Sequence, residues 1–150
     1  MATGVTGLYN NTMDAKGRVS IPAKYRDVLG SEFKLSRGMD GCLALFTKEE
    51  WTTFEGGLRK LPILNEGVRN MIRSFVSVAE DVTLDKQGRL LIPQGLRNIA
   101  GLQKEVVVTA GTHSSVEIWD KERYDEKFTN IDISDIANKL SEQGYTLDIF

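Results

Sequence analysis

The chain has 150 residues, of which 41% are hydrophobic and 27% charged, and its formal net charge at pH 7 is −2. No apolar run approaches the roughly 20 residues of a transmembrane helix, and no signal-peptide pattern opens the chain. We therefore expect no membrane contact and a cytoplasmic protein made of one domain or two small halves that share a core. The single cysteine, Cys42, excludes an internal disulfide framework and is expected to be a small buried side chain.

One stretch of the chain occurs twice. Residues 14–26 read DAKGRVSIPAKYR, and residues 85–97 read DKQGRLLIPQGLR. Six of the thirteen positions are identical, and a glycine follows each copy at the same distance, as Gly30 and Gly101. We conclude that the chain carries two copies of one supersecondary unit.

The first copy is predicted to be a hairpin. After an irregular start over residues 1–6, a strand over 7–13 leads into a three-residue loop, 15–17, whose last residue is a glycine suited to positive φ. Asp14 would then face Arg18 as a cross-strand pair. The second copy is predicted to have the same elements, namely a strand over 80–84, a loop over 86–88, and the pair Asp85 and Arg89.

Proline and glycine then mark a short helix in each copy. Pro22 and Pro93 suit the first turn of a helix, and Gly30 and Gly101 suit its end. The helices are predicted over residues 23–29 and 94–100. Each is followed by two strands, predicted over 32–35 and 43–46 in the first copy and over 106–110 and 115–119 in the second.

Longer helical patterns follow the strands. Thr47 and Glu50 form a capping box, which starts a helix that Pro62 ends. Its apolar stripe is Trp51, Phe54, Leu58 and Leu61, and a second helix opened by Asn65 carries Val68, Met71, Ile72, Phe75 and Val76. These stripes are expected to be core, with a subunit interface as the alternative. Asp120 is the predicted N-cap of a helix over 121–128, and a last helix carries Ile133, Ile136, Ala137 and Leu140 and ends near Gly144. Residues 145–150 fit a terminal strand or a disordered tail.

The predicted fold class is α+β, a duplicated β-hairpin and short-helix unit with pseudo-two-fold symmetry and flanking helices. The expected divisions are a first half over 7–53, a helical connector over 54–79, a second half over 80–128, and a C-terminal helix or tail over 129–150.

The sequence offers no catalytic, metal or cofactor site, and no small-molecule ligand is evident. His113 is the only histidine, and its place in a predicted turn favours a solvated side chain. Asp14 and Asp85 each have an arginine partner, which lowers the pKa of a carboxyl and suits neither a general acid nor a base near neutral pH. We therefore predict that the protein is not an enzyme.

Double-stranded DNA is a candidate partner that the two arginines suggest. Arg18 and Arg89 each offer a planar fork of donors that matches guanine or phosphate. Phosphate contacts would come from the nearby cations Lys16, Lys24, Arg26, Lys86 and Arg97. The alternative is that each aspartate–arginine pair only closes a hairpin and that these cations are solvated. The tail from Asp120 onward, with eight acids against four bases, hides the basic character of the repeats.

The residues that carry these motifs resemble the MraZ family. The resemblance rests on the paired Asp-x-x-x-Arg motifs, each followed by Ile-Pro, and on residues 37–43 (RGMDGCL) and 49–51 (EEW), and it runs from about residue 7 to 128. It implies two fused AbrB-like halves of the swapped-hairpin type that assemble into a ring of identical subunits. It also implies a bacterial transcriptional regulator, associated with the nucleoid, that binds short repeated boxes in the promoter of the division and cell-wall gene cluster.

The resemblance also implies which residues contact DNA. The family's motif positions correspond here to Asp14, Lys16, Arg18, Asp85, Lys86 and Arg89, while position 87 is Gln rather than Lys. One subunit would bind weakly, and a ring on repeated sites would gain affinity through effective concentration. The alternative function is an AbrB-type antitoxin whose tail, residues 132–150, folds on a partner protein.

Overall fold

The computed structural model describes residues 5–146. The first repeat supplies β1 (Leu8–Thr12), β2 (Arg18–Ser20), α1 (Ala23–Leu29), β3 (Phe33–Arg37), β4 (Leu43–Phe46) and α2 (Lys48–Arg59). After α3 (Glu66–Val76), the second repeat supplies the corresponding elements β5 (Glu80–Val82), β6 (Arg89–Leu91), α4 (Gln94–Ala100), β7 (Glu105–Ala110), β8 (Val116–Asp120) and α5 (Lys121–Phe128), and α6 (Ile133–Glu142) follows. Mixed helices and antiparallel strands confirm the predicted α+β class. No helix among these residues combines the length and apolar character needed to cross a membrane.

The two repeats interlock through their strands. A six-stranded sheet has the order β1-β7-β8-β4-β3-β5, and β2 and β6 form a separate two-stranded sheet. The first strand of each repeat pairs with the third-position strand of the other repeat, as in the pairs Leu8↔Thr109 and Phe33↔Val82. Neither repeat therefore completes its share of the sheet alone.

The main core lies between the sheet and the β2–β6 pair. Alternate residues of a strand point to opposite faces of a sheet, so β3 and β7 bury Leu35 and Val108 on the inner side. Helices α1 and α4 close this core with Tyr25, Leu29, Leu96 and Ala100. The outer face of the sheet is covered by α2 over Phe46 and by α5 over Trp119.

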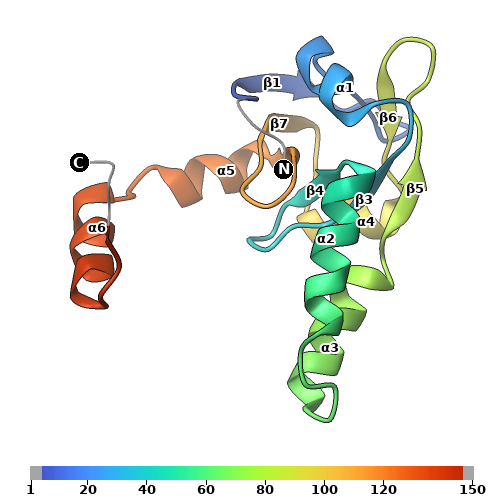
Figure 1. The fold of residues 1–150 in the computed structure, drawn as a ribbon. Coiled ribbons are helices and arrows are strands. Elements are labelled where there is room, and N and C mark those ends of the chain that lie inside the picture. The colour runs from blue at the N-terminus through green and yellow to red at the C-terminus, as the bar shows by residue number, and fades with distance from the viewer. Residues whose placement is uncertain (1–4, 147–150) are drawn as a thin grey trace.

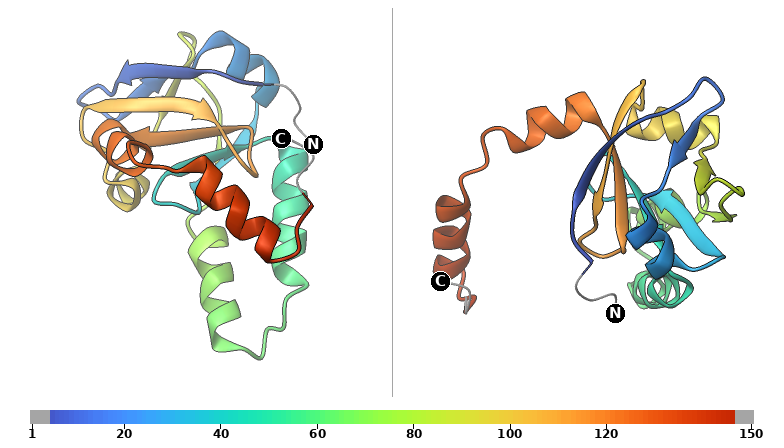
Figure 2. Two further views of the ribbon diagram at one scale, coloured as in Figure 1. Left: turned by 90° about the vertical axis from the view of Figure 1, so that its left-hand side faces the viewer. Right: turned by 90° about the horizontal axis from the view of Figure 1, so that it is seen from above.

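The remaining helices extend from this body. In Figure 1 and the left view of Figure 2, α2 and α3 lie side by side and project from the sheet. Figure 1 shows α6 apart from the body, at the end of the chain that follows α5. None of the residues of α5 or α6 is fully buried.

Local sequence signals set most helix ends. The helices predicted over residues 23–29 and 94–100 are present, each between a proline and a glycine. The capping box is confirmed, since the Thr47 N–H donates to Glu50 Oε1 at 2.9 Å and the Glu50 N–H donates to Thr47 Oγ1 at 3.0 Å. The Asp120 cap is also present, with the Arg123 N–H donating to its carboxylate at 3.3 Å.

Some predicted boundaries were wrong. Helix α2 ends at Arg59, and Leu61 lies beyond it and is exposed, because the residue before a proline is pushed out of the α region. Strand β3 runs over Phe33–Arg37 rather than residues 32–35, and β5 ends at Val82 rather than at residue 84. The predictions for residues 1–4 and 147–150 lie outside the described residues.

Candidate nucleic-acid interface

The loop between β1 and β2 has the tight turn that its sequence predicts, but the predicted hairpin is wrong, because β1 pairs with β7 and β2 pairs with β6 rather than with each other. The Gly17 N–H donates to the Asp14 carbonyl, and the Asp14 N–H donates to the Arg18 carbonyl, both at 3.0 Å. Gly17 has a φ of 88°, a conformation that glycine adopts at the least steric cost. The loop between β5 and β6 repeats both bonds at 3.0 Å with a glycine φ of 74°, and its residues are Asp85, Gly88 and Arg89. We call residues 14–18 the first loop and residues 85–89 the second loop.

Each loop aspartate accepts three hydrogen bonds. Asp14 Oδ1 accepts from the backbone N–H groups of Lys16 and Arg18 at 3.0 and 2.9 Å, and Oδ2 accepts from Arg18 Nε at 2.6 Å. Asp85 makes the same bonds at 2.9, 2.9 and 2.8 Å. The backbone N–H of the arginine, followed by its guanidinium, lowers the pKa of each carboxyl below its usual value. Both aspartates are thus ionised at neutral pH and suited to hold an arginine.

The guanidinium group of each loop arginine is held by its aspartate through only one of its nitrogen atoms. Each ion pair joins the aspartate to Nε, so it leaves the two terminal amino groups of the guanidinium for another acceptor. The side chains of Arg18 and Arg89 remain 31% and 29% exposed. A guanidinium restrained in this way loses less conformational entropy when it binds a ligand.

The two loops are tied to each other across the repeats. The Gly17 carbonyl accepts from the Ile92 N–H at 2.9 Å, and the Gly88 carbonyl accepts from the Ile21 N–H at 3.0 Å. Between them, β2 and β6 pair antiparallel to form what we call the β2–β6 ribbon. The right view of Figure 2 shows both loops, blue and yellow-green, on the side of the molecule away from α6. The sequence-predicted arginines are therefore brought together.

The β2–β6 ribbon has one buried and one outward face. Val19 pairs with Leu90 at its centre, and both side chains are fully buried. The alternate positions form the outward face, which consists of Arg18, Ser20, Arg89 and Leu91. Arg18 lies opposite Leu91 and diagonal to Arg89, and diagonal neighbours on paired strands lie about 7–8 Å apart. The sequence did not single out Leu91, whose exposure follows from the period of two once β6 is placed.

Two of the predicted phosphate-binding cations also support the loops. The Arg97 guanidinium packs so closely on the first loop that a Cβ at Gly17 would lie 2.8 Å from Cζ, and a Cβ at Gly88 would collide with Arg26. Arg97 Nε also donates to the Ile92 carbonyl at 2.9 Å. Each helix therefore buttresses the loop of the other repeat. Because Arg26 and Arg97 end the two copies of the motif, the sequence could have suggested that they share a role. It could not have shown that each contacts the loop of the other repeat.

The predicted lysines differ in their surroundings. Lys24 Nζ donates to the Thr6 carbonyl at 2.5 Å and lies 5.6 Å from the centre of the Tyr9 ring. Lys16 and Lys86 are exposed on the first and second loops. These two positions suit contacts with a ligand that reaches the loop tips.

The prediction that His113 is solvated was wrong, because its ring is partly buried. The His113 ring packs against Phe46 and Phe54, with ring centres 5.3 and 5.1 Å apart, and burial lowers its pKa. The Cys42 thiol is buried as predicted, and burial raises its pKa to about 12. Residues 5–146 contain no group of three or more potential metal ligands.

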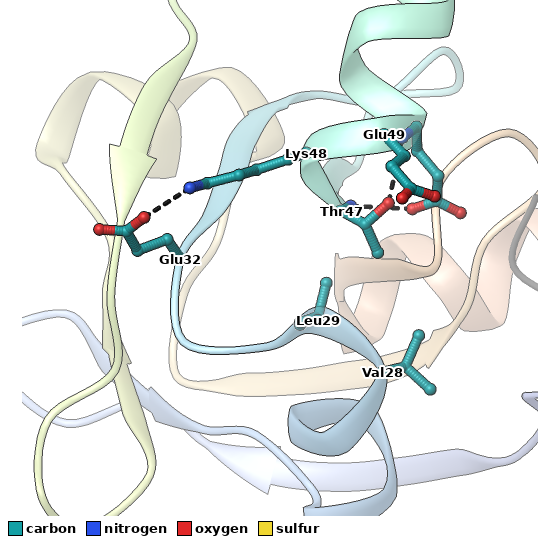
Figure 3. A pocket seen from close by; sticks show the side chains of 7 residues that line it. Val28, Leu29, Glu32, Thr47, Lys48 and Glu49 are labelled. Carbon is teal, nitrogen blue, oxygen red and sulfur yellow. Dashed lines mark hydrogen bonds and ion pairs between the residues drawn. The ribbon is translucent and has the colours of Figure 1, made fainter.

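A surface hollow lies between the end of α1 and the start of α2 (Figure 3), lined by Val28, Leu29, Glu32, Thr47, Lys48, Glu49 and Glu50. Lys48 Nζ is paired with Glu32 at 2.5 Å, and Thr47 and Glu50 are occupied by the helix cap. Because these polar groups are already paired with one another by hydrogen bonds or ion pairs, the hollow does not indicate a catalytic site.

The fold and its exposed loops define a class of protein: two interlocked strand–loop–strand–helix repeats that present a pair of aspartate-held arginines on one surface. Comparisons with known proteins agree with this duplication. A family model described as "MraZ protein, putative antitoxin-like" matches the chain twice, over residues 5–72 and 75–143.

Similar proteins cover nearly the whole chain. The protein named "Transcriptional regulator MraZ" from Clostridium beijerinckii is 45% identical over 139 residues, which cover 92% of this chain and 97% of that protein. Proteins of the same name from Clostridium tetani and Acetivibrio thermocellus are 43% and 44% identical, with the same coverage. The chain belongs to the MraZ family.

Proposed function

We propose that the protein is a sequence-specific transcriptional regulator that binds double-stranded DNA through the β2–β6 ribbon and its two loops. One observation carries the proposal: Arg18 and Arg89 lie on one outward face, each restrained by an aspartate through Nε. A two-stranded ribbon fits the major groove of B-DNA, and arginine is the commonest reader of guanine there. The names of the similar proteins support regulation of transcription.

The other predicted residues receive roles from their positions. Asp14 and Asp85 would orient the arginines, and Lys16 and Lys86 at the loop tips would contact phosphates. Arg26 and Arg97 buttress the loops and, with Lys24, would add positive charge beside the ribbon. The strand exchange between repeats supports the swapped-hairpin architecture. The divisions 7–53, 54–79, 80–128 and 129–150 are part of the proposal, and the first boundary falls within α2.

We also propose that the subunits assemble into a ring. Helix α6 exposes Ile133 and Ile136, and the connection between α2 and α3 exposes 94% of Leu64. In Figure 1 these two regions lie on different sides of the molecule. Two different apolar surfaces on one chain fit a head-to-tail contact, which closes into a ring when the rotation allows it. Several ribbons on one ring would favour repeated promoter boxes through avidity.

The proposed target is the promoter of the source bacterium's division and cell-wall gene cluster, so that the protein would act in the cytoplasm on the nucleoid. Fluorescence anisotropy with a labelled duplex of that promoter tests this. The Arg18→Ala, Arg89→Ala double variant is expected to lose about 1–3 kcal/mol of binding free energy for each bidentate contact.

Arg59→Ala is the matched control, because Arg59 also pairs through Nε with a carboxylate four residues away, at 2.8 Å, but lies on α2. It should bind as the wild type does. Wild-type affinity of a folded Arg18→Ala, Arg89→Ala protein for the promoter would refute the proposed function.

Assembly is tested separately by light scattering after size exclusion. The Leu64→Ser, Ile133→Ser variant is expected to lower the molar mass of the particle and to weaken binding to repeated boxes by roughly 10²- to 10⁴-fold. An unchanged molar mass would place the subunit contact elsewhere.

A further inference from the structure

The outward face of the β2–β6 ribbon is symmetric except at one pair of positions. The pairs Arg18↔Leu91 and Ser20↔Arg89 are equivalent under the duplication, with Val19 and Leu90 between them. One cross-strand pair thus sets an arginine opposite a serine, and the other sets an arginine opposite a leucine. The Leu91 side chain is 58% exposed.

Exposure of a single leucine is common on protein surfaces and has no meaning by itself. The position of Leu91 is what distinguishes it. Residues directly opposite on paired strands have Cβ atoms about 4.5–5.5 Å apart, so Leu91 lies beside Arg18, and it is two residues from Arg89 on the same face. An apolar group is therefore held on the ribbon next to both arginines, opposite one and on the same strand as the other.

The fold keeps Leu91 in this place. Its neighbours along the chain, Leu90 and Ile92, are both fully buried, and the Ile92 N–H is bonded to the Gly17 carbonyl at 2.9 Å. Because the residues on either side are fixed in the core, Leu91 cannot turn inward without moving the whole strand. Its exposure is thus a consequence of the same register that exposes the arginines.

The chemistry of the major groove supplies one apolar partner. Base edges in that groove present hydrogen-bond donors and acceptors, and the 5-methyl group of thymine is their apolar feature. We infer that Leu91 is a specificity-determining residue that contacts a thymine methyl group beside the positions read by Arg18 and Arg89. This inference rests on the proposed function, because it requires that the ribbon face the major groove.

The contact would also give the ribbon a direction on DNA. Ser20, at the position equivalent to Leu91, can hydrogen-bond to either kind of base edge and has little apolar surface. A thymine opposite Leu91 therefore fixes which repeat lies on which half of the bound box. One subunit would read a box that is not a palindrome.

Substitution of uracil for thymine tests the contact, since uracil lacks the methyl group and keeps the hydrogen-bonding edge. The probe is a duplex selected from a random-sequence pool by the wild-type protein, with each thymine replaced in turn. For the wild type, one replacement is expected to weaken binding about four-fold, the effect of exposing one buried methyl-sized group. Leu91→Ser, which copies the first repeat, should bind the thymine and uracil duplexes equally.

Leu8→Ser is the matched control, because Leu8 is also an exposed strand leucine, at 46%, but lies on β1 outside the ribbon. It should keep the wild-type preference for thymine. The inference is overturned if no thymine is sensitive, if Leu91→Ser keeps the preference, or if Leu91→Ser changes the oligomeric state, which would assign Leu91 to a subunit contact. DNA binding that does not depend on Arg18 and Arg89 would instead overturn the proposed function itself.

Discussion

The first and second loops share their internal framework and differ in the side chains they expose. Both have an aspartate that accepts two backbone N–H groups and one arginine Nε, and both have a glycine at positive φ. The exposed positions differ: Ala15 and Lys16 in the first loop correspond to Lys86 and Gln87 in the second, and beyond the loops Ser20 on β2 corresponds to Leu91 on β6. The shared aspartate and glycine framework holds the arginines in place, and the differing exposed side chains determine what each half can recognise.

The largest expected effect is on the shared framework. Gly17→Ala and Gly88→Ala should each lower the free energy of unfolding by about 2–3 kcal/mol, because each forces a side chain into a strained conformation and onto an arginine. Urea unfolding followed by tryptophan fluorescence measures this. If the repeats are structurally equivalent, the two losses should agree.

A double variant separates strain from collision. In Gly88→Ala, Arg26→Ala, the side chain that the new methyl group meets is removed. The double variant should therefore lose less free energy of unfolding than the sum of the losses in the two single variants. Full additivity would show that Arg26 does not rest on the second loop.

The next effect concerns DNA binding by each arginine alone. Arg18→Ala and Arg89→Ala should each weaken binding to the promoter duplex by about 1–3 kcal/mol, or roughly 5- to 150-fold. Since both guanidinium groups are held in the same way and are about equally exposed, we expect similar losses in anisotropy titrations. A large loss from one variant and none from the other would mean that only one loop reads bases.

A smaller effect is expected at the loop tips. Gln87→Lys adds a positive charge to the second loop at the position equivalent to Lys16, and one added phosphate contact should steepen the plot of log affinity against log salt concentration by about 0.9. Lys16→Gln should make it shallower by the same amount. Equal slopes for the wild type and both variants would remove position 16 and its equivalent from the phosphate contacts.

The short-range parts of this architecture could be predicted from the sequence. The loops and the helices α1 and α4 follow from glycine and proline at fixed places, whose effects depend on the local backbone. The pairing of β1 with β7 and of β5 with β3 could not be read in the same way, because a strand's sequence does not name its partner. It is this exchange that places the two loops together.

The candidate site shows the same limit. The bond between Asp14 and Arg18 is local and was predicted, whereas the packing of Arg97 on Gly17 joins residues 80 positions apart. The burial of His113 likewise depends on Phe46 in β4 and Phe54 in α2, which both come from the other repeat. Contacts between distant segments decide whether a polar residue is exposed, and its immediate neighbours in the sequence do not.

The smallest expected effect is a difference in acid stability. The pKa of Asp14 and Asp85 is lowered below 3.8 in the folded protein. Because the folded-state pKa is the lower one, the ionised carboxylates stabilise the fold fully above about pH 3.8, and this stabilisation is lost as the pH falls through the folded-state pKa. Both groups are solvent-accessible, which screens their charge and keeps the effect modest.

Urea midpoints measured at pH values from neutral to about 2 test this. Asp14→Asn and Asp85→Asn should each flatten the acid part of the curve, and by equal amounts if the loops are equivalent. Arg18→Gln should flatten it less than Asp14→Asn, because the main cause of the low pKa is the backbone N–H of residue 18, which that variant retains. If Arg18→Gln flattened the curve as much as Asp14→Asn, the guanidinium rather than the loop backbone would hold the charge, and the aspartate would depend on the arginine that it is proposed to position.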